Sequence, residues 1–157
     1  MRHTLGILLA SASLLLTTGC GADTPGGDVA QEPSGPTTAT SEAAEPVVLD
    51  ILSQTAAGGE TTDLAIDLST PAGVEELVGP VSRGGLDDQV RHRVAEIDVP
   101  QGQRLVGAVV NVGCDVPSDV TVTVDGDDVL LEPVFTGDRL PECLAAVTSI
   151  ALVLVAS

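Results

Sequence analysis

The region of residues 104–156 most constrains the fold of this chain, because it holds four apolar runs of strand length separated by turn signals. The first run, 105–112, and the last, 145–155, are apolar at nearly every position. Such runs are typical of central strands that are covered on both faces of a sheet. We therefore expect both runs to lie in the interior of a β-rich domain.

The two middle runs predict a hairpin. In 120–124, valines alternate with threonines, which is the period of a half-buried strand. Asp125 and Gly126 follow, and Gly126 can adopt the positive φ that a tight turn requires before the next run, 129–134. Residues 136–142 then cross over to the last strand.

Cys114 and Cys143 stand on either side of this hairpin. A bridge between them would close a loop of about thirty residues and, in the chain-entropy account, stabilise the fold by roughly 3–4 kcal/mol. A reactive pair is the alternative, but the flanking Asp115 and Glu142 disfavour the thiolate form. We predict a structural disulfide.

Upstream, residues 46–52 and 62–68 predict two further strands, the second with Leu64, Ile66 and Leu68 on one face. Residues 69–71, Ser-Thr-Pro, are a helix-start signal, and 74–78 would give one or two helical turns before Gly79 and Pro80 end them.

Residues 86–99 fit two patterns. Val90, Val94 and Ile97 recur at helical spacing, whereas Ala95, Ile97 and Val99 alternate like a strand that ends at Pro100. Because β-branched residues dominate the end of the segment, we interpret 93–99 as a strand.

These elements predict an all-β fold for residues 46–157: an antiparallel β-sandwich, immunoglobulin-like, with one disulfide and at most one short helix. The tryptophan and the tyrosine corner of true immunoglobulin domains are missing. The topology is thus an analogy from which no function follows.

Composition excludes several functions. Six basic residues, all Arg, face 23 acidic ones, so the chain repels phosphate backbones and we expect no nucleic-acid partner. Phe135 is the only aromatic residue. Sugar platforms and single-stranded nucleic-acid grooves need aromatic faces, which this chain lacks.

The N-terminus resembles an export signal. A short basic start precedes an apolar stretch, 5–16, which is shorter than the roughly 20 residues that span a bilayer. Residues 17–20, Thr-Thr-Gly-Cys, then resemble a bacterial lipobox, although Thr17 stands where that pattern prefers leucine. The resemblance implies a lipoprotein signal peptide at 1–19 and acylation of Cys20, with palmitate-type chains. The alternative is an ordinary secretory signal cut near Cys20, which would leave this cysteine as a spare thiol.

The segment that follows, 20–45, is rich in Gly, Pro, Ser, Thr and acidic residues. Such a composition buries too little apolar surface to offset the entropy of ordering. We expect a disordered linker that carries the domain away from a lipid anchor.

Candidate chemistry is sparse. A triad would combine His92 with Ser82 or Ser118 and with Asp87 or Asp98, but no nucleophile-elbow motif is present, and one histidine with two bridged cysteines cannot complete a zinc site. A weak candidate for calcium is the acidic hairpin turn, Asp125, Asp127 and Asp128, although the spacing departs from that of an EF-hand.

The runs 112–117 and 142–148 resemble small secreted proteins of actinobacteria that lack a defined role. The resemblance implies a location outside the cytoplasm more than an activity. We expect a lipoprotein on the outer face of the cell membrane, with a non-catalytic β-sandwich that has a binding or structural role and an unknown protein or envelope partner. We expect no enzymatic activity and no cofactor. The alternative is a secreted hydrolase or a calcium-binding domain without a recognisable motif.

Overall fold

A computed structural model describes residues 44–62, 64–138 and 142–157. The predicted signal peptide, 1–19, the predicted acylation site, Cys20, and nearly all of the predicted linker, 20–45, lie outside these residues. The described elements are, in chain order, β1 (Val47–Thr55), β2 (Ile66–Asp67), α1 (Pro71–Val78), η1 (Gly79–Val81), α2 (Leu86–Glu96), β3 (Gln103–Gly113), β4 (Asp119–Asp125), β5 (Asp128–Val134) and β6 (Val147–Ala156).

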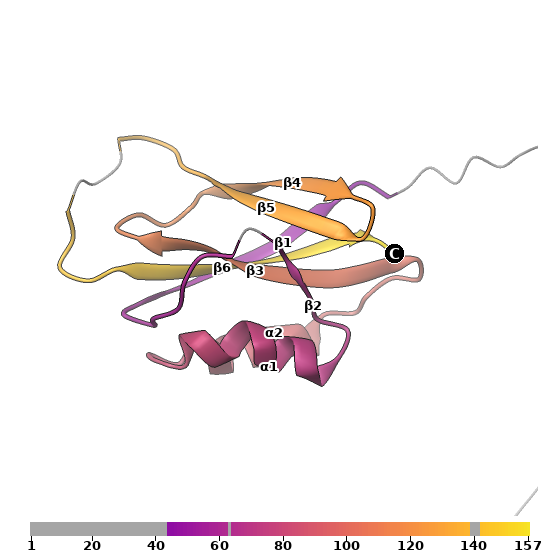
Figure 1. The fold of residues 1–157 in the computed structure, drawn as a ribbon, viewed down its shortest axis with the longest axis horizontal. Coiled ribbons are helices and arrows are strands. Elements are labelled where there is room, and N and C mark those ends of the chain that lie inside the picture. The colour runs from indigo at the N-terminus through magenta and orange to yellow at the C-terminus, as the bar shows by residue number, and fades with distance from the viewer. Residues whose placement is uncertain (1–43, 63, 139–141) are drawn as a thin grey trace, which may run out of the picture. The chain divides into compact units, whose positions relative to one another are not determined.

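A four-stranded antiparallel sheet, in the order β1-β6-β3-β2, forms the middle layer (Figure 1). Alternate residues of β6 point to opposite faces, as the pleat of a strand dictates. Ile150 and Leu152 are buried on one face, and Ala151 and Val153 are buried on the other. The prediction that 105–112 is a central strand covered on both sides is confirmed, and so is a mostly buried last strand, although β6 begins at Val147.

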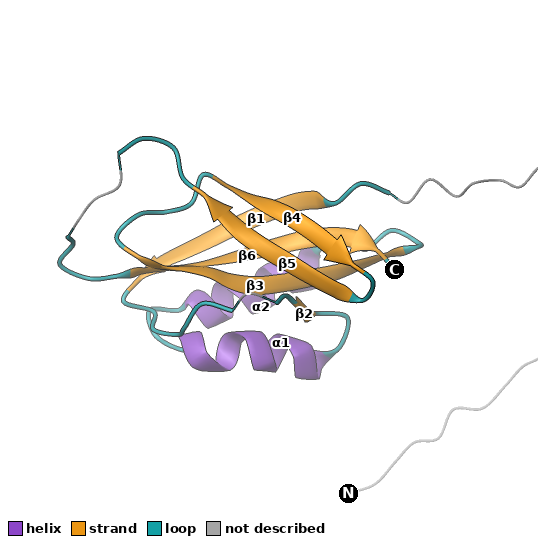
Figure 2. Cartoon of the chain, turned by 45° about the horizontal axis from the view of Figure 1, so that its top comes forward, coloured by secondary structure: helices purple, strands orange, loops and turns teal. Residues whose placement is uncertain are grey.

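Helices α1 and α2 cover the first face (Figure 2). Helix α1 begins where the sequence predicts: the hydroxyl of Thr70 accepts a hydrogen bond from the backbone N–H of Gly73 at 3.2 Å, and Pro71 occupies the first turn. We call the cluster beneath the helices the helix-side core. Its buried members are Ala57, Leu68, Leu77, Val78, Val81, Leu86, Val90, Leu105, Val109, Ile150, Leu152 and Leu154.

The β4–β5 hairpin covers the second face (Figure 2). Its turn contains Gly126 with φ of +61°, so the predicted hairpin is confirmed. We call the cluster beneath it the hairpin-side core, formed by Val106, Ala108, Val110, Val120, Val129, Leu131, Ala151, Val153 and Val155. The described chain therefore has three layers: helices, main sheet and hairpin.

The prediction of an all-β, immunoglobulin-like sandwich is wrong. The fold is mixed α/β, with one four-stranded antiparallel sheet, a two-stranded hairpin and two helices. A sandwich needs a second full sheet to cover the inner face of the first. Here the two central strands, β3 and β6, are apolar on both faces. The hairpin covers one face, and the helices between β2 and β3 cover the other.

The predicted strand at 93–99 is wrong as well. Residues 93–96 belong to α2, and the chain from Ile97 to Pro100 is outside any strand. Helical spacing prevails because Leu86, Val90 and Val94 all meet the helix-side core. Acidic residues in the first turn and a basic residue in the last also suit the helix dipole.

The predicted strand at 62–68 is much shorter than expected, because this segment joins two layers. The N–H of Ala65 donates to the carbonyl of Val129 in β5 at 2.8 Å, and Ile66 and Asp67 then pair with β3. Leu64, expected on the buried face, is 54% exposed. We call residues 64–67 the crossing segment.

Candidate functional site

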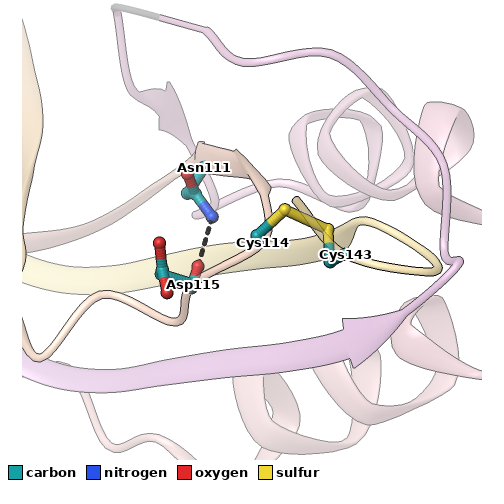
Figure 3. The surroundings of a disulfide bond; sticks show 4 residues. All are labelled: Asn111, Cys114, Asp115 and Cys143. Carbon is teal, nitrogen blue, oxygen red and sulfur yellow. Dashed lines mark hydrogen bonds between the residues drawn. A yellow bond between two sulfur atoms is a disulfide. The ribbon is translucent and has the colours of Figure 1, made fainter. Parts of the chain in front are cut away.

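The disulfide lies where the sequence predicts it. Cys114 and Cys143 are bonded, with their Cα atoms 5.3 Å apart (Figure 3). Cys114 directly follows Gly113, which pairs with Val147 at the end of the β3–β6 ladder. The bridge therefore extends the contact between two neighbouring strands of one sheet, whereas an immunoglobulin bridge would join two sheets.

The turn after β3 is held by a side chain. The amide nitrogen Nδ2 of Asn111 donates to the carbonyl of Asp115 at 2.7 Å, so the chain bends back beside the disulfide (Figure 3). Asn111 is buried, and this bond satisfies a polar group that would otherwise be costly in the interior. The polar side chain and the bridge together fix the base of the hairpin region.

The acidic hairpin turn gives little support to a calcium site. Asp125 and Asp128 are paired opposite each other, but the carbonyl of Asp127 accepts a hydrogen bond from Nη2 of Arg104 at 2.7 Å. The guanidinium of Arg104 therefore places a positive charge beside the turn, which disfavours a bound cation there. Within the described residues, no group of three or more His, Cys, Asp or Glu side chains is placed to hold a metal ion.

The residues of the candidate triad are not assembled. His92 is exposed on α2, and its Nδ1 lies 3.5 Å from a carboxylate oxygen of Glu96. Ser118 lies at the base of the hairpin, where its hydroxyl donates to the carbonyl of Val134 at 3.1 Å. The main sheet thus separates these two side chains. Asp87 instead binds Arg91, and Ser82 and Asp98 are exposed loop residues without a recorded bond to His92.

Sequence reasoning missed an ionic cluster on the helices. The guanidinium of Arg91 donates two hydrogen bonds of 3.0 Å to the carboxylate of Glu75 in α1 and one of 3.0 Å to Asp87 in α2. These bonds lower the pKa of Glu75 and of Asp87 and raise the pKa of Arg91. The spacing of Asp87 and Arg91 is a recognisable helical pair, but Glu75 lies sixteen residues away and gives no local signal.

Beside this cluster lies a shallow groove of about 330 Å³ between the helices, with Leu68, Val74 and Val94 on its walls. Since the guanidinium of Arg91 is already bound by two carboxylates, the groove offers no uncommitted cation for an anionic ligand. Ser69, which is part of its lining, donates a hydrogen bond from its hydroxyl to the carboxylate of Asp67, and both residues are exposed. The bonds of Arg91 to Glu75 and Asp87 tie the two helices together.

The two ends of the domain differ. Val47 pairs with Leu154 at one end of the sheet, and Thr55 pairs with Val147 at the other, close to the disulfide. The chain from the N-terminal region thus enters at the end that also holds the β4–β5 turn, as Figure 1 shows. The opposite end presents the disulfide and Leu144, which is fully exposed.

No protein-family model, curated protein or solved structure matches this chain. None of the described helices is long and apolar enough to cross a membrane.

Proposed function

We propose that this chain is an exported lipoprotein, anchored through Cys20 to the outer face of the cell membrane. The observation that carries the proposal is the division of the three cysteines. Cys114 and Cys143 are bonded to each other, which leaves Cys20 alone at the end of a signal-like stretch. An unpaired thiol is a liability in an oxidising compartment, and acylation would remove it.

The body of the protein, 46–157, acts in this proposal as a non-catalytic module with a binding or structural role in the envelope. The separation of His92 from Ser118 supports a non-catalytic role, and so does the commitment of Arg91 to carboxylates. The acidic surface favours a protein or envelope partner over nucleic acid. The linker at 20–45 would let the module reach that partner from its anchor.

Metabolic labelling with a clickable palmitate analogue, followed by intact-mass measurement, tests the anchor. We expect label on the wild-type chain, a mass that corresponds to acylated Cys20 with residues 1–19 removed, and partition into the detergent phase. Cys20→Ala should lose the label and leave the membrane fraction. Cys143→Ala is the matched control, because it also removes one cysteine but should keep the label. An unacylated mature start at Ala22 or beyond would contradict the proposal.

A further inference from the structure

The hairpin is attached to the rest of the domain differently from every other strand. Within the described residues, its backbone joins the main sheet only through the crossing segment, by the bond from Ala65 to Val129. One side-chain bond, from Arg104 to the carbonyl of Asp127, adds to this. Apolar packing in the hairpin-side core joins the hairpin to the main sheet over the rest of this face. Its attachment therefore depends on packing more than on a hydrogen-bonded ladder.

The main sheet has its own sources of stability. Strand β6 is paired along its length with β1 on one side and with β3 on the other. The helix-side core covers the opposite face and contains no residue of β4 or β5. The sheet and helices can therefore keep their structure when the hairpin lifts. Such a division into units with different opening free energies is a general property of small domains.

The disulfide stands at the base of the hairpin region. It joins the end of β3 to the approach to β6, across a sequence separation of 29 residues. Cys143 is exposed and Cys114 is half-buried, so a dissolved thiol can reach the bridge. A closed bridge restricts the chain once the hairpin has lifted, and this restriction favours the packed state.

We propose that the β4–β5 hairpin is a cover over the second face of the main sheet, that it unfolds separately from the sheet and helices, and that the Cys114–Cys143 bridge is the redox-sensitive lock that keeps it closed. A dithiol reductant opens the lock. Its thiolate attacks the exposed sulfur of Cys143, and the S–S bond breaks with release of Cys114 as a thiolate that takes up a proton. The second thiol of the reductant then displaces Cys143, so the reductant leaves as a disulfide and both cysteines become thiols.

Opening uncovers an apolar strip on the sheet. The strip consists of Val106, Ala108, Val110, Ala151, Val153 and Val155, all of them almost fully buried while the cover is closed. The cover thus converts a thiol–disulfide change at one end of the domain into a change of the surface that the domain presents.

Hydrogen exchange measured by mass spectrometry tests the proposal on the full chain in detergent, with Cys20→Ser to remove the third thiol. Exchange is compared before and after treatment with dithiothreitol. We expect the amides of β4 and β5 to exchange about a hundredfold faster after reduction, in line with the loss of loop closure. The amides of β3 and β6 that bond within the main sheet should change by less than about threefold, the scatter expected for an untouched unit.

Cys114→Ser with Cys143→Ser should reproduce the reduced pattern without any reductant. Leu77→Ala is the control, because it weakens the helix-side core and should speed exchange in β3 and β6 while the bridge stays intact. Two outcomes overturn the proposal: strands β3 and β6 lose protection in step with the hairpin, or the hairpin keeps its protection after complete reduction. A double variant that fails to fold counts as the first of these, since it shows that the bridge stabilises the whole domain.

Discussion

Gly107 of β3 lies directly beneath Leu77 of α1, and a Cβ atom at Gly107 would come within 3.0 Å of the Cδ2 atom of Leu77. The same atom would stand 2.9 Å from a methyl of Leu68 and 3.1 Å from the carbonyl oxygen of Ala151. The missing side chain therefore sets the distance at which the helix packs on the sheet. Val109 and Leu105, its neighbours on the same face, contribute the apolar surface on either side.

Gly107→Ala tests this contact. We expect a loss of about 1–3 kcal/mol in the free energy of unfolding, because the helix or the Ala151 backbone must shift to admit a methyl group. Gly79→Ala is the comparison variant: beyond its chain neighbours nothing lies within 4 Å of the added atom, and only the following Pro80 disfavours a side chain in this helical backbone. That variant should lose about 1 kcal/mol or less, because the added methyl meets no packed helix or sheet. Urea unfolding measures both, and equal midpoints would contradict the packing account.

Leu77→Ala and Leu144→Ala compare the same substitution at the two extremes of burial. Leu77 is 2% exposed in the helix-side core, whereas Leu144 is completely exposed beside the disulfide. The first should lose about 2–5 kcal/mol in the free energy of unfolding through lost transfer energy and a cavity. The second should stay within about 0.5 kcal/mol of wild type. A loss at Leu144 comparable to that at Leu77 would show that Leu144 is covered by part of the chain or by another molecule.

The Arg91 cluster predicts a pH dependence. Its hydrogen bonds hold the pKa of Glu75 and of Asp87 below the ordinary values, so the stabilisation is present above the unfolded-state pKa of these groups and is lost as pH falls through the folded-state pKa. Arg91→Gln should therefore have a lower melting temperature than wild type at pH 7. The difference should shrink below about pH 5 and vanish in strong acid.

Arg83→Gln serves as the control for that experiment, since Arg83 is an exposed arginine for which the described residues show no ion pair. Its melting temperature should follow that of wild type at every pH. A difference between Arg91→Gln and wild type that stays constant down to pH 2 would mean that Arg91 acts through packing of its stem.

The hairpin turn should contain mutual repulsion between Asp125 and Asp128, which are paired directly across the two strands. Like charges in this position are unfavourable. Asp128→Asn should therefore stabilise the protein by a few tenths of a kcal/mol, about the size of a cross-strand pair term, and most clearly at low salt. Melting temperatures measured by calorimetry with 1 mM calcium and with a chelator distinguish this charge repulsion from metal binding. A rise in melting temperature with calcium in wild type that is lost in Asp128→Asn would instead support the calcium alternative.

The elements predicted correctly from the sequence are those that a few neighbouring residues specify. Asp125 and Gly126 specify a tight turn by themselves, and Thr70 with Pro71 specifies a helix start. The apolar run 105–112 also predicted burial on both faces of its strand. It did not predict which elements would cover those faces. Helix α2 was missed because Ile97 fits both patterns, the helical spacing of Val90 and Val94 and the alternation of a strand that ends at Pro100. Packing of Val90 and Val94 against the helix-side core selects the helix.

The candidate site illustrates the same limit. Cys114 and Cys143 could be paired by elimination, since the remaining cysteine lies in a separate export-like region. The bond from Arg91 to Glu75 joins two helices across sixteen residues and depends on how they pack, which no local pattern encodes. The separation of His92 from Ser118 likewise depends on the tertiary fold, because α2 and the hairpin lie on opposite faces of the main sheet.

The crossing segment has a consequence for how this sequence can vary. Because Ala65 bonds to the hairpin and Ile66 bonds to the main sheet, two adjacent residues set the alignment of two layers at once. One residue inserted between them would shift the alignment with the main sheet by one residue relative to the alignment with the hairpin, and the side chains that follow would point to the opposite face. We therefore expect length changes to be tolerated at the exposed Glu60 and Thr61 and to be rejected only a few positions later, where this short segment sets the spacing of two layers.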